Sequence, residues 1–76
     1  MDIKEVPDDV RYRIFDYLWE RGVRSSDLGV DSTYVNSNRK VGISDKLLEK
    51  LVNMLTVDEF VVLTYYIIFL PYSLNA

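Results

Sequence analysis

The sequence predicts an all-α domain, built as a small bundle of four to five helices. Two observations carry this prediction. Apolar residues recur at intervals of three and four positions, and residues typical of helix caps stand before several of these runs. A length of 76 residues allows a single domain, which we place over 1–76, and a hydrophobic content of 49% is sufficient for a packed core.

The first helix is expected over 7–21. Pro7 suits the first helical position because its φ is fixed near the helical value, and two aspartates follow it where the helix dipole favours negative charge. Gly22 is a natural stop just beyond the last turn. The apolar face of this helix contains Val10, Ile14, Tyr17 and Leu18.

A polar stretch with small turns follows. Ser25 is expected to cap a single helical turn through Leu28, and Gly29 then supplies a sharp turn. The next helix has about two turns. It begins after a cap at Asp31 or Ser32 and ends at Asn38 or Arg39.

Two further helices complete the bundle. Ser44 is the expected cap of the fourth, whose apolar positions are Leu47, Leu48, Leu51, Met54 and Leu55. Thr56 and Glu59 form a capping box, so the fifth helix begins at Val57, and Pro71 ends it. Its later part, 60–70, is apolar all round and rich in β-branched and aromatic residues, which leaves a strand open as an alternative there. The side chains predicted to be buried in the bundle are Leu18, Val35, Leu48, Leu51 and Leu55.

A short helix, a glycine turn and a polar helix together have the layout of a helix-turn-helix, whose second helix enters the major groove of DNA. Leu28, Val30 and Val35 would hold the two helices together. Phosphates would be contacted by Arg24, Arg39 and Lys40. The other polar residues of the second helix would face outwards, toward the DNA. The alternative is a polar helix that simply faces solvent. The predicted DNA-binding residues are Arg24, Ser32, Thr33, Tyr34, Asn36, Ser37, Arg39 and Lys40.

The segment RGVRSSDLGVDSTYVNSNRKVGISDKLLEKLVNMLTVDEF resembles the helix-turn-helix module at the N-terminus of archaeal tyrosine recombinases (integrases). It is also similar to the homeodomain-like units of archaeal CRISPR repeat-binding proteins. The resemblance covers roughly 7–62 and implies an archaeal domain that binds duplex DNA, as the DNA-binding part of an integrase-like or repeat-binding protein. The absence of cysteine fits a cytoplasmic location. Two features depart from the common pattern: Leu28 is followed at once by Gly29, and Asn36, Ser37 and Asn38 are consecutive weak helix formers.

The amino-acid composition excludes several kinds of catalytic and metal-binding site. The chain has no cysteine and no histidine, which excludes thiolate nucleophiles, Ser-His pairs and the common zinc motifs. We therefore expect no enzyme activity, no metal, no cofactor and no small-molecule substrate. The apolar run over 60–70 is too short to cross a membrane, which requires about 20 residues.

Charge is distributed unevenly along the chain. The net charge is −3, yet residues 11–50 hold eight bases against six acids, and the ends hold one base against six acids. This pattern permits contact with DNA, with weak and salt-dependent binding. A second hypothesis is a protein-interaction or dimerisation module that uses the apolar C-terminal helix. Its predicted interface, which would also form a homodimer, consists of Phe60, Leu63, Tyr66, Ile67 and Leu70.

Overall fold

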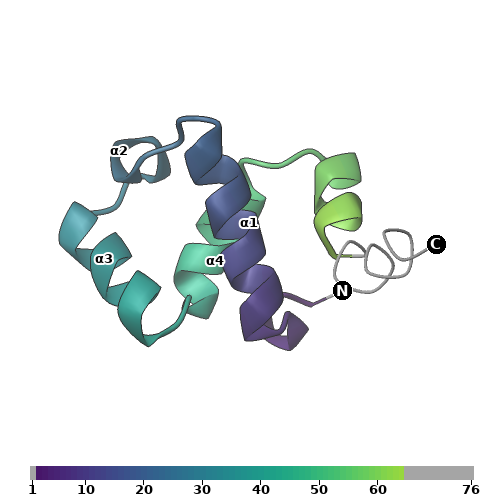
Figure 1. Cartoon of the computed structure of the whole chain (residues 1–76), viewed down its shortest axis with the longest axis horizontal. Coiled ribbons are helices and arrows are strands. Elements are labelled where there is room, and N and C mark those ends of the chain that lie inside the picture. The colour runs from purple at the N-terminus through teal and green to yellow at the C-terminus, as the bar shows by residue number, and fades with distance from the viewer. Residues whose placement is uncertain (1, 65–76) are drawn as a thin grey trace, which may run out of the picture.

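The computed structural model describes residues 2–64, and over this range the chain is helical with no strand, which confirms the predicted all-α bundle. A last helix covers 57–64, so the strand alternative is wrong as far as residue 64, while 65–70 lie outside the described residues. Figure 1 shows α1 in the centre, α2 and α3 on one side of it, and the helix at 57–64 on the other. The labelled elements are the 3₁₀ turn η1 (Ile3–Glu5), α1 (Asp8–Glu20), α2 (Ser25–Leu28), α3 (Ser32–Val41) and α4 (Asp45–Val52).

Helix α1 begins one residue later and ends one residue earlier than predicted. Pro7 is its N-cap and not its first helical residue, because its ψ of 159° is extended. Gly22 has a φ of +92°, which lets the N–H of Val23 turn back and donate to the Leu18 carbonyl at 3.1 Å. The predicted glycine stop is confirmed.

The turn between α2 and α3 follows the sequence pattern, although the cap of α2 does not. Arg24 and not Ser25 precedes the helix, and its backbone N–H donates to the Asp27 carboxylate at 2.8 Å. Gly29 has a φ of +70°, the left-handed conformation that a sharp turn requires.

Helix α3 begins as predicted, with Asp31 as its cap accepting from the Thr33 N–H at 3.2 Å. It then continues to Val41, beyond the predicted end at Asn38 or Arg39. The extension has a tertiary cause, because the Tyr12 hydroxyl of α1 donates to the Asn38 and Arg39 carbonyls at 3.3 and 3.1 Å. The Arg39 carbonyl gains a partner near the helix end, where helical donors run out, and the Asn38 carbonyl gains a second partner beside the Gly42 N–H at 2.8 Å.

Helix α4 is capped by Ser44, whose hydroxyl accepts from the Leu47 N–H at 3.2 Å. It ends at Val52, so Met54 and Leu55 lie in the following turn and do not continue its apolar face. Leu55 is therefore half-buried, and its predicted burial is wrong. The predicted capping box is present: the Thr56 N–H donates to Glu59 at 2.9 Å, and the Glu59 N–H donates to the Thr56 hydroxyl at 3.1 Å.

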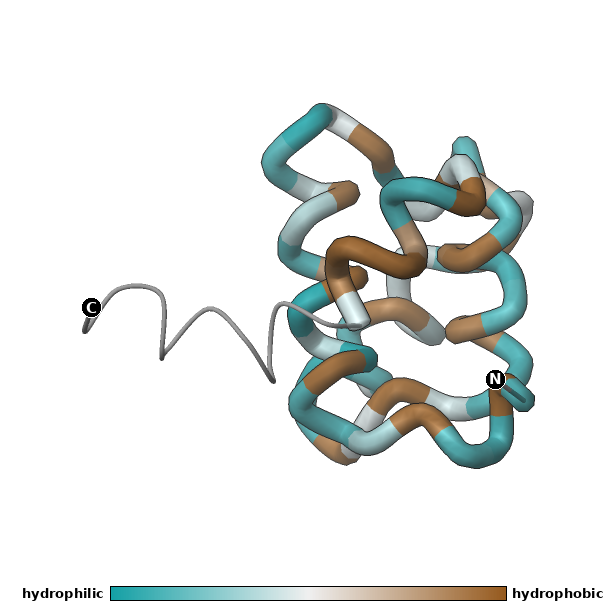
Figure 2. The backbone as a smooth tube through the Cα atoms, turned by 90° about the vertical axis from the view of Figure 1, so that its right-hand side faces the viewer, coloured by the Kyte–Doolittle hydropathy of each residue, from teal (hydrophilic) through white to brown (hydrophobic). Residues whose placement is uncertain are grey.

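The hydrophobic core lies between α1 and α4, which pack against each other, and α2 packs against α3. Hydrophobic and hydrophilic stretches alternate along the chain in Figure 2, as amphipathic helices require. The predicted burial of Leu18, Val35, Leu48 and Leu51 is confirmed. The largest fully buried side chains are Phe15, Ile14, Leu47, Leu48 and Leu51.

A charged residue lies inside this bundle. Arg11 is only 6% exposed, and its guanidinium donates to the carbonyls of Val6 and Ile43 at 2.8 Å and of Ile3 at 3.1 Å. It also forms an ion pair with Asp45 at 2.8 Å. Arg11 thus joins η1, α1 and the start of α4. No local sequence pattern indicates this role, since Ile43 is 32 residues away.

No helix within residues 2–64 is both long enough and apolar enough to cross a membrane.

Candidate nucleic-acid interface

Helix α3 lies at one end of the molecule, away from the helix at 57–64 (Figure 1). Its inner side is anchored by Val35, which is 3% exposed, and its neighbour α2 contributes the buried Leu28. Val30, in the turn between them, is half-buried. The three residues predicted to hold the two helices together are therefore all at least partly buried, with Val35 and Leu28 in the core.

Asn38 fixes the orientation of α3. It is 7% exposed, its Nδ2 donates to the Tyr34 carbonyl at 2.9 Å, and its Oδ1 accepts from the Ser44 N–H at 2.7 Å. Both ends of the amide are engaged, which joins α3 to the start of α4. From the sequence, Asn38 is only a weak helix former. Its bond to Ser44 could not be predicted, because Ser44 caps the next helix and no local pattern indicates the contact.

The outer side of α3 carries short polar side chains. Ser32, Thr33, Asn36 and Ser37 are all exposed, as predicted, and none of their side chains bonds to another described residue. Thr33, Asn36, Ser37 and Lys40 follow one another at intervals of three and four, so they share one face of the helix. We call these four residues the outer row.

The two bases at the end of α3 take different positions. Lys40 is exposed and belongs to the outer row, whereas Arg39 stands at its edge, with its guanidinium carbon 5.5 Å from the ring centre of Phe15 in α1. Asn36, Arg39 and Lys40 together line an open hollow on the surface. This hollow is the concave part of the predicted DNA-binding surface.

Tyr34 does not face outwards with the other predicted residues. It is half-buried, and its hydroxyl lies 2.7 Å from the Ser44 hydroxyl. The ring fills the edge of α3 next to α4, because position 34 turns toward the interior side of the helix. The Nζ of Lys46 lies 5.9 Å from the centre of this ring.

Arg24 forms contacts within the chain that the sequence pattern does not indicate. It is exposed, but its Nη1 donates to the carbonyls of Trp19 and Val23 at 3.0 and 2.7 Å, and the guanidinium lies 5.7 Å from the Trp19 ring centre. Arg24 therefore bonds to one carbonyl in the last turn of α1 and to one in the turn that follows. Its contact with phosphate stays a prediction.

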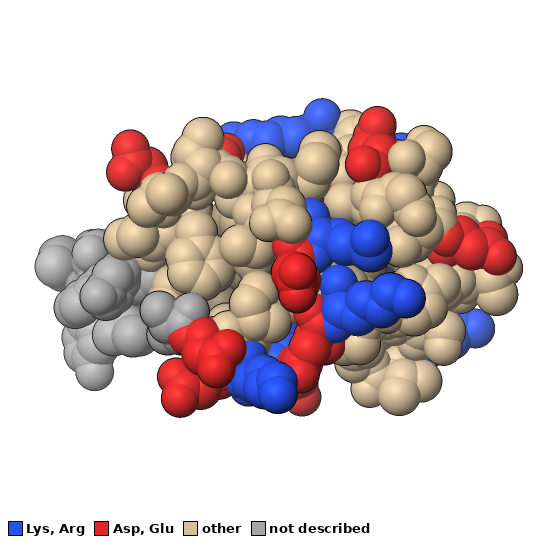
Figure 3. All heavy atoms as spheres, turned by 180° about the vertical axis from the view of Figure 1, so that it is seen from behind, with Lys and Arg blue, Asp and Glu red and all other residues tan. Residues whose placement is uncertain are grey.

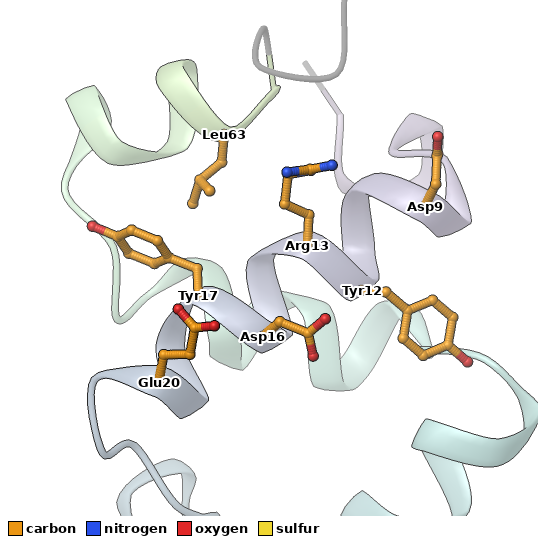
Figure 4. Close-up of a pocket in the computed structure, with 7 residues that line it drawn as sticks. All are labelled: Asp9, Tyr12, Arg13, Asp16, Tyr17, Glu20 and Leu63. Atoms are coloured by element: carbon orange, nitrogen blue, oxygen red, sulfur yellow. The ribbon is translucent and has the colours of Figure 1, made fainter. Parts of the chain in front are cut away.

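A second concave surface lies along α1 on the side of the helix at 57–64. In Figure 4, Arg13 and Tyr17 point toward Leu63, whereas Tyr12 points away from it toward α3. The groove has an excess of negative charge, which repels phosphates, because its lining includes three carboxylates but only the Arg13 guanidinium. Neither these carboxylates nor any other described His, Cys, Asp or Glu residues form a group of three or more that could hold a metal ion. The groove is lined by Asp9, Tyr12, Arg13, Asp16, Tyr17, Glu20 and Leu63.

On the reverse face, acidic and basic side chains lie next to one another across the middle of the molecule (Figure 3). No extended area of one charge forms on that face. The end of the molecule at α3 combines the exposed bases Arg39 and Lys40 with exposed polar side chains, and the exposed Asp31 caps the helix there.

The helix at 57–64 is tied to α1 by polar contacts. The Tyr17 hydroxyl donates to the Glu59 carboxylate, and the Arg21 guanidinium lies 3.7 Å from the centre of the Tyr17 ring. Two hydrogen bonds lower the pKa of the Glu59 carboxyl group: the larger effect comes from the Thr56 N–H and the smaller from the Tyr17 hydroxyl. The hydrogen bond to Glu59 in turn raises the pKa of Tyr17.

The predicted protein interface is only partly available. Leu63 is 7% exposed and belongs to the core, so its assignment to an external interface is wrong, and Phe60 is half-buried against the same core. Tyr66, Ile67 and Leu70 lie outside the described residues. The exposed apolar residues of this helix are instead Val57, Val61 and Val62, which are 79%, 42% and 61% exposed.

The chain matches no known protein family, and no curated protein or solved structure is significantly similar to it. The resemblance to the recombinase and repeat-binding modules therefore stays a prediction.

Proposed function

We propose that the domain binds duplex DNA by placing α3 in the major groove. The outer row carries this proposal, because it presents an amide, two hydroxyls and an ammonium group that bond to no other described residue. Such groups match the donors and acceptors on base edges in the major groove. Val35 and Asn38 hold the same helix from inside, so these groups are presented on a fixed backbone.

The charges favour an approach from the α3 end. Lys40 and Arg39 are exposed there, whereas the groove along α1 has an excess of carboxylates. A net charge of −3 limits binding to non-specific DNA, and the contacts of the exposed bases with phosphates make this binding dependent on salt. The resemblance of the sequence to the recombinase and repeat-binding modules supports the further proposal of a role as the DNA-binding part of an archaeal integrase-like or repeat-binding protein. The lack of cysteine and histidine supports a non-catalytic role in the cytoplasm.

Fluorescence anisotropy with a labelled 20-base-pair duplex of random sequence tests the proposal. The double variant Asn36→Ala/Lys40→Ala should bind about tenfold more weakly than the wild type, since it removes one amide and one ammonium group. Lys4→Ala is the matched control, because it also removes one positive charge, from an exposed position on η1. Absence of salt-dependent binding by the wild type, or equal binding by the double variant, would refute the proposal.

A second candidate function is self-association through the helix at 57–64. The observation in its favour is the exposure of Val57 and Val62 on a helix whose other side is packed against the core. Exposed apolar side chains on one helix face are common at protein interfaces. Sedimentation equilibrium tests this candidate. A dimer should form in the wild type and be weakened by Val62→Asp, whereas a species of 8.9 kDa at every concentration would refute it.

A further inference from the structure

We propose that Arg39 and Lys46 contact the phosphates of the two opposite DNA strands, one on each side of α3. This inference rests on the proposed function and adds a residue from outside the helix-turn-helix. It also moves Lys40 from the phosphates to the groove, because Lys40 belongs to the outer row.

Helix geometry shows which residues of α3 lie at its two edges, on either side of the outer row. Successive residues of a helix are turned by about 100°, so Arg39 stands about 100° from Lys40 in one direction and Tyr34 about 120° in the other. Arg39 therefore supplies a positive charge at one edge. Tyr34, at the other edge, has no charge of its own.

Lys46 supplies the missing charge. It is exposed at the start of α4, and its Nζ lies 5.9 Å from the centre of the Tyr34 ring, which the Ser44 hydroxyl holds in place. The adjacent Asp45 is engaged by Arg11 at 2.8 Å, and Lys46 forms no ion pair with a described residue. An ammonium group thus lies at the edge of α3 that faces α4.

The width of the major groove explains why residues at the two edges of α3 would contact the two different DNA strands. A helix with its side chains is about 10–12 Å wide, and the major groove of B-DNA is about 12 Å wide, with one phosphate backbone along each side. When the outer row faces the base pairs, charges at opposite edges of the helix meet opposite backbones. Phosphate contacts on both strands fix the register in which the bases are read.

The salt dependence of binding to the 20-base-pair random duplex gives the first test. Lys46→Ala and Arg39→Ala should each reduce the slope of log K against log salt by about 0.9, and the double variant by about twice as much. Lys4→Ala should leave the slope unchanged. If Lys46→Ala also leaves it unchanged while Asn36→Ala/Lys40→Ala weakens binding, this inference fails and the proposed function stands. If the wild type does not bind the duplex at all, the proposed function itself fails.

A strand-specific test uses a duplex that the wild-type domain selects from a random pool. Neutral methylphosphonate linkages are introduced one at a time along each strand. The wild type should be sensitive on both strands, Lys46→Ala should lose sensitivity on one strand, and Arg39→Ala should lose it on the other. Loss on the same strand for both variants would overturn the arrangement. So would equal affinity for an RNA duplex of the same sequence, whose major groove is too narrow for a helix.

Discussion

Replacement of Arg11 should destabilise the domain more than any single change at its surface. The guanidinium donates to three backbone carbonyls, those of Val6, Ile43 and Ile3, and it is 6% exposed. Without the guanidinium the Val6 and Ile43 carbonyls lose this donor, at a cost of about 1–3 kcal/mol each, whereas the Ile3 carbonyl still accepts from the Val6 N–H at 3.2 Å. Loss of the buried aliphatic part of the side chain adds to this cost. A domain of this size has a free energy of unfolding of about 4–11 kcal/mol. Arg11→Ala should therefore lose about 3–5 kcal/mol.

Urea unfolding followed by circular dichroism measures this loss, and two further variants identify its cause. Arg11→Met restores the aliphatic volume but not the hydrogen bonds, so it should remain strongly destabilised. Asp45→Asn removes only the ion pair, and because the Asp45 side chain is 52% exposed its cost should be about 1 kcal/mol or less. A loss below about 1 kcal/mol for Arg11→Ala would refute the reasoning, as would an Arg11→Met variant as stable as the wild type.

Three more predictions concern the core, a turn and a pH-dependent contact. Leu51 is fully buried, so Leu51→Ala should cost about 2–5 kcal/mol in urea unfolding, and a cost below about 0.5 kcal/mol would show that α4 has been assigned the wrong face. Gly29 has a φ of +70° and open space around it, so Gly29→Ala should cost about 1–2 kcal/mol through backbone strain alone, measured as a lower urea midpoint at unchanged slope. The pKa of Glu59 is lowered in the folded state from its usual 4.5, so its contribution to stability is complete above that pH and is lost as the pH falls below it. The urea midpoint should consequently decline less on acidification in Glu59→Gln than in the wild type, and parallel curves would contradict this assignment.

Features that depend on neighbouring residues could be predicted from the sequence. The caps at Asp31 and Ser44 and the capping box of Thr56 and Glu59 are formed within three residues, so the residue types alone indicate them. The glycine turn at Gly29 is equally local. These signals placed each helix start from α3 onward, and they predicted which side of α3 faces solvent.

Features that depend on distant residues could not be predicted. Arg11 bonds to Ile43, which is 32 residues away, and Tyr12 extends α3 through carbonyls 26 and 27 residues away. Tyr34 was predicted to face outwards, but it is half-buried and its hydroxyl bonds to that of Ser44, ten residues away. Lys46 was missed for the same reason, because only the fold brings α4 to the edge of α3.

On α3, the residues that anchor the helix are different from those that face outwards. This separation affects how the sequence of such a domain can vary during evolution. Val35 and Asn38 hold the helix, and the outer row does not contribute to this attachment. Substitutions in the outer row should therefore have little effect on folding, usually within about 0.5 kcal/mol, and are free to vary independently of the scaffold. A library randomised at positions 33, 36, 37 and 40 would thus consist mostly of folded proteins. The same separation would let natural variants acquire new binding preferences without first passing through unstable intermediates.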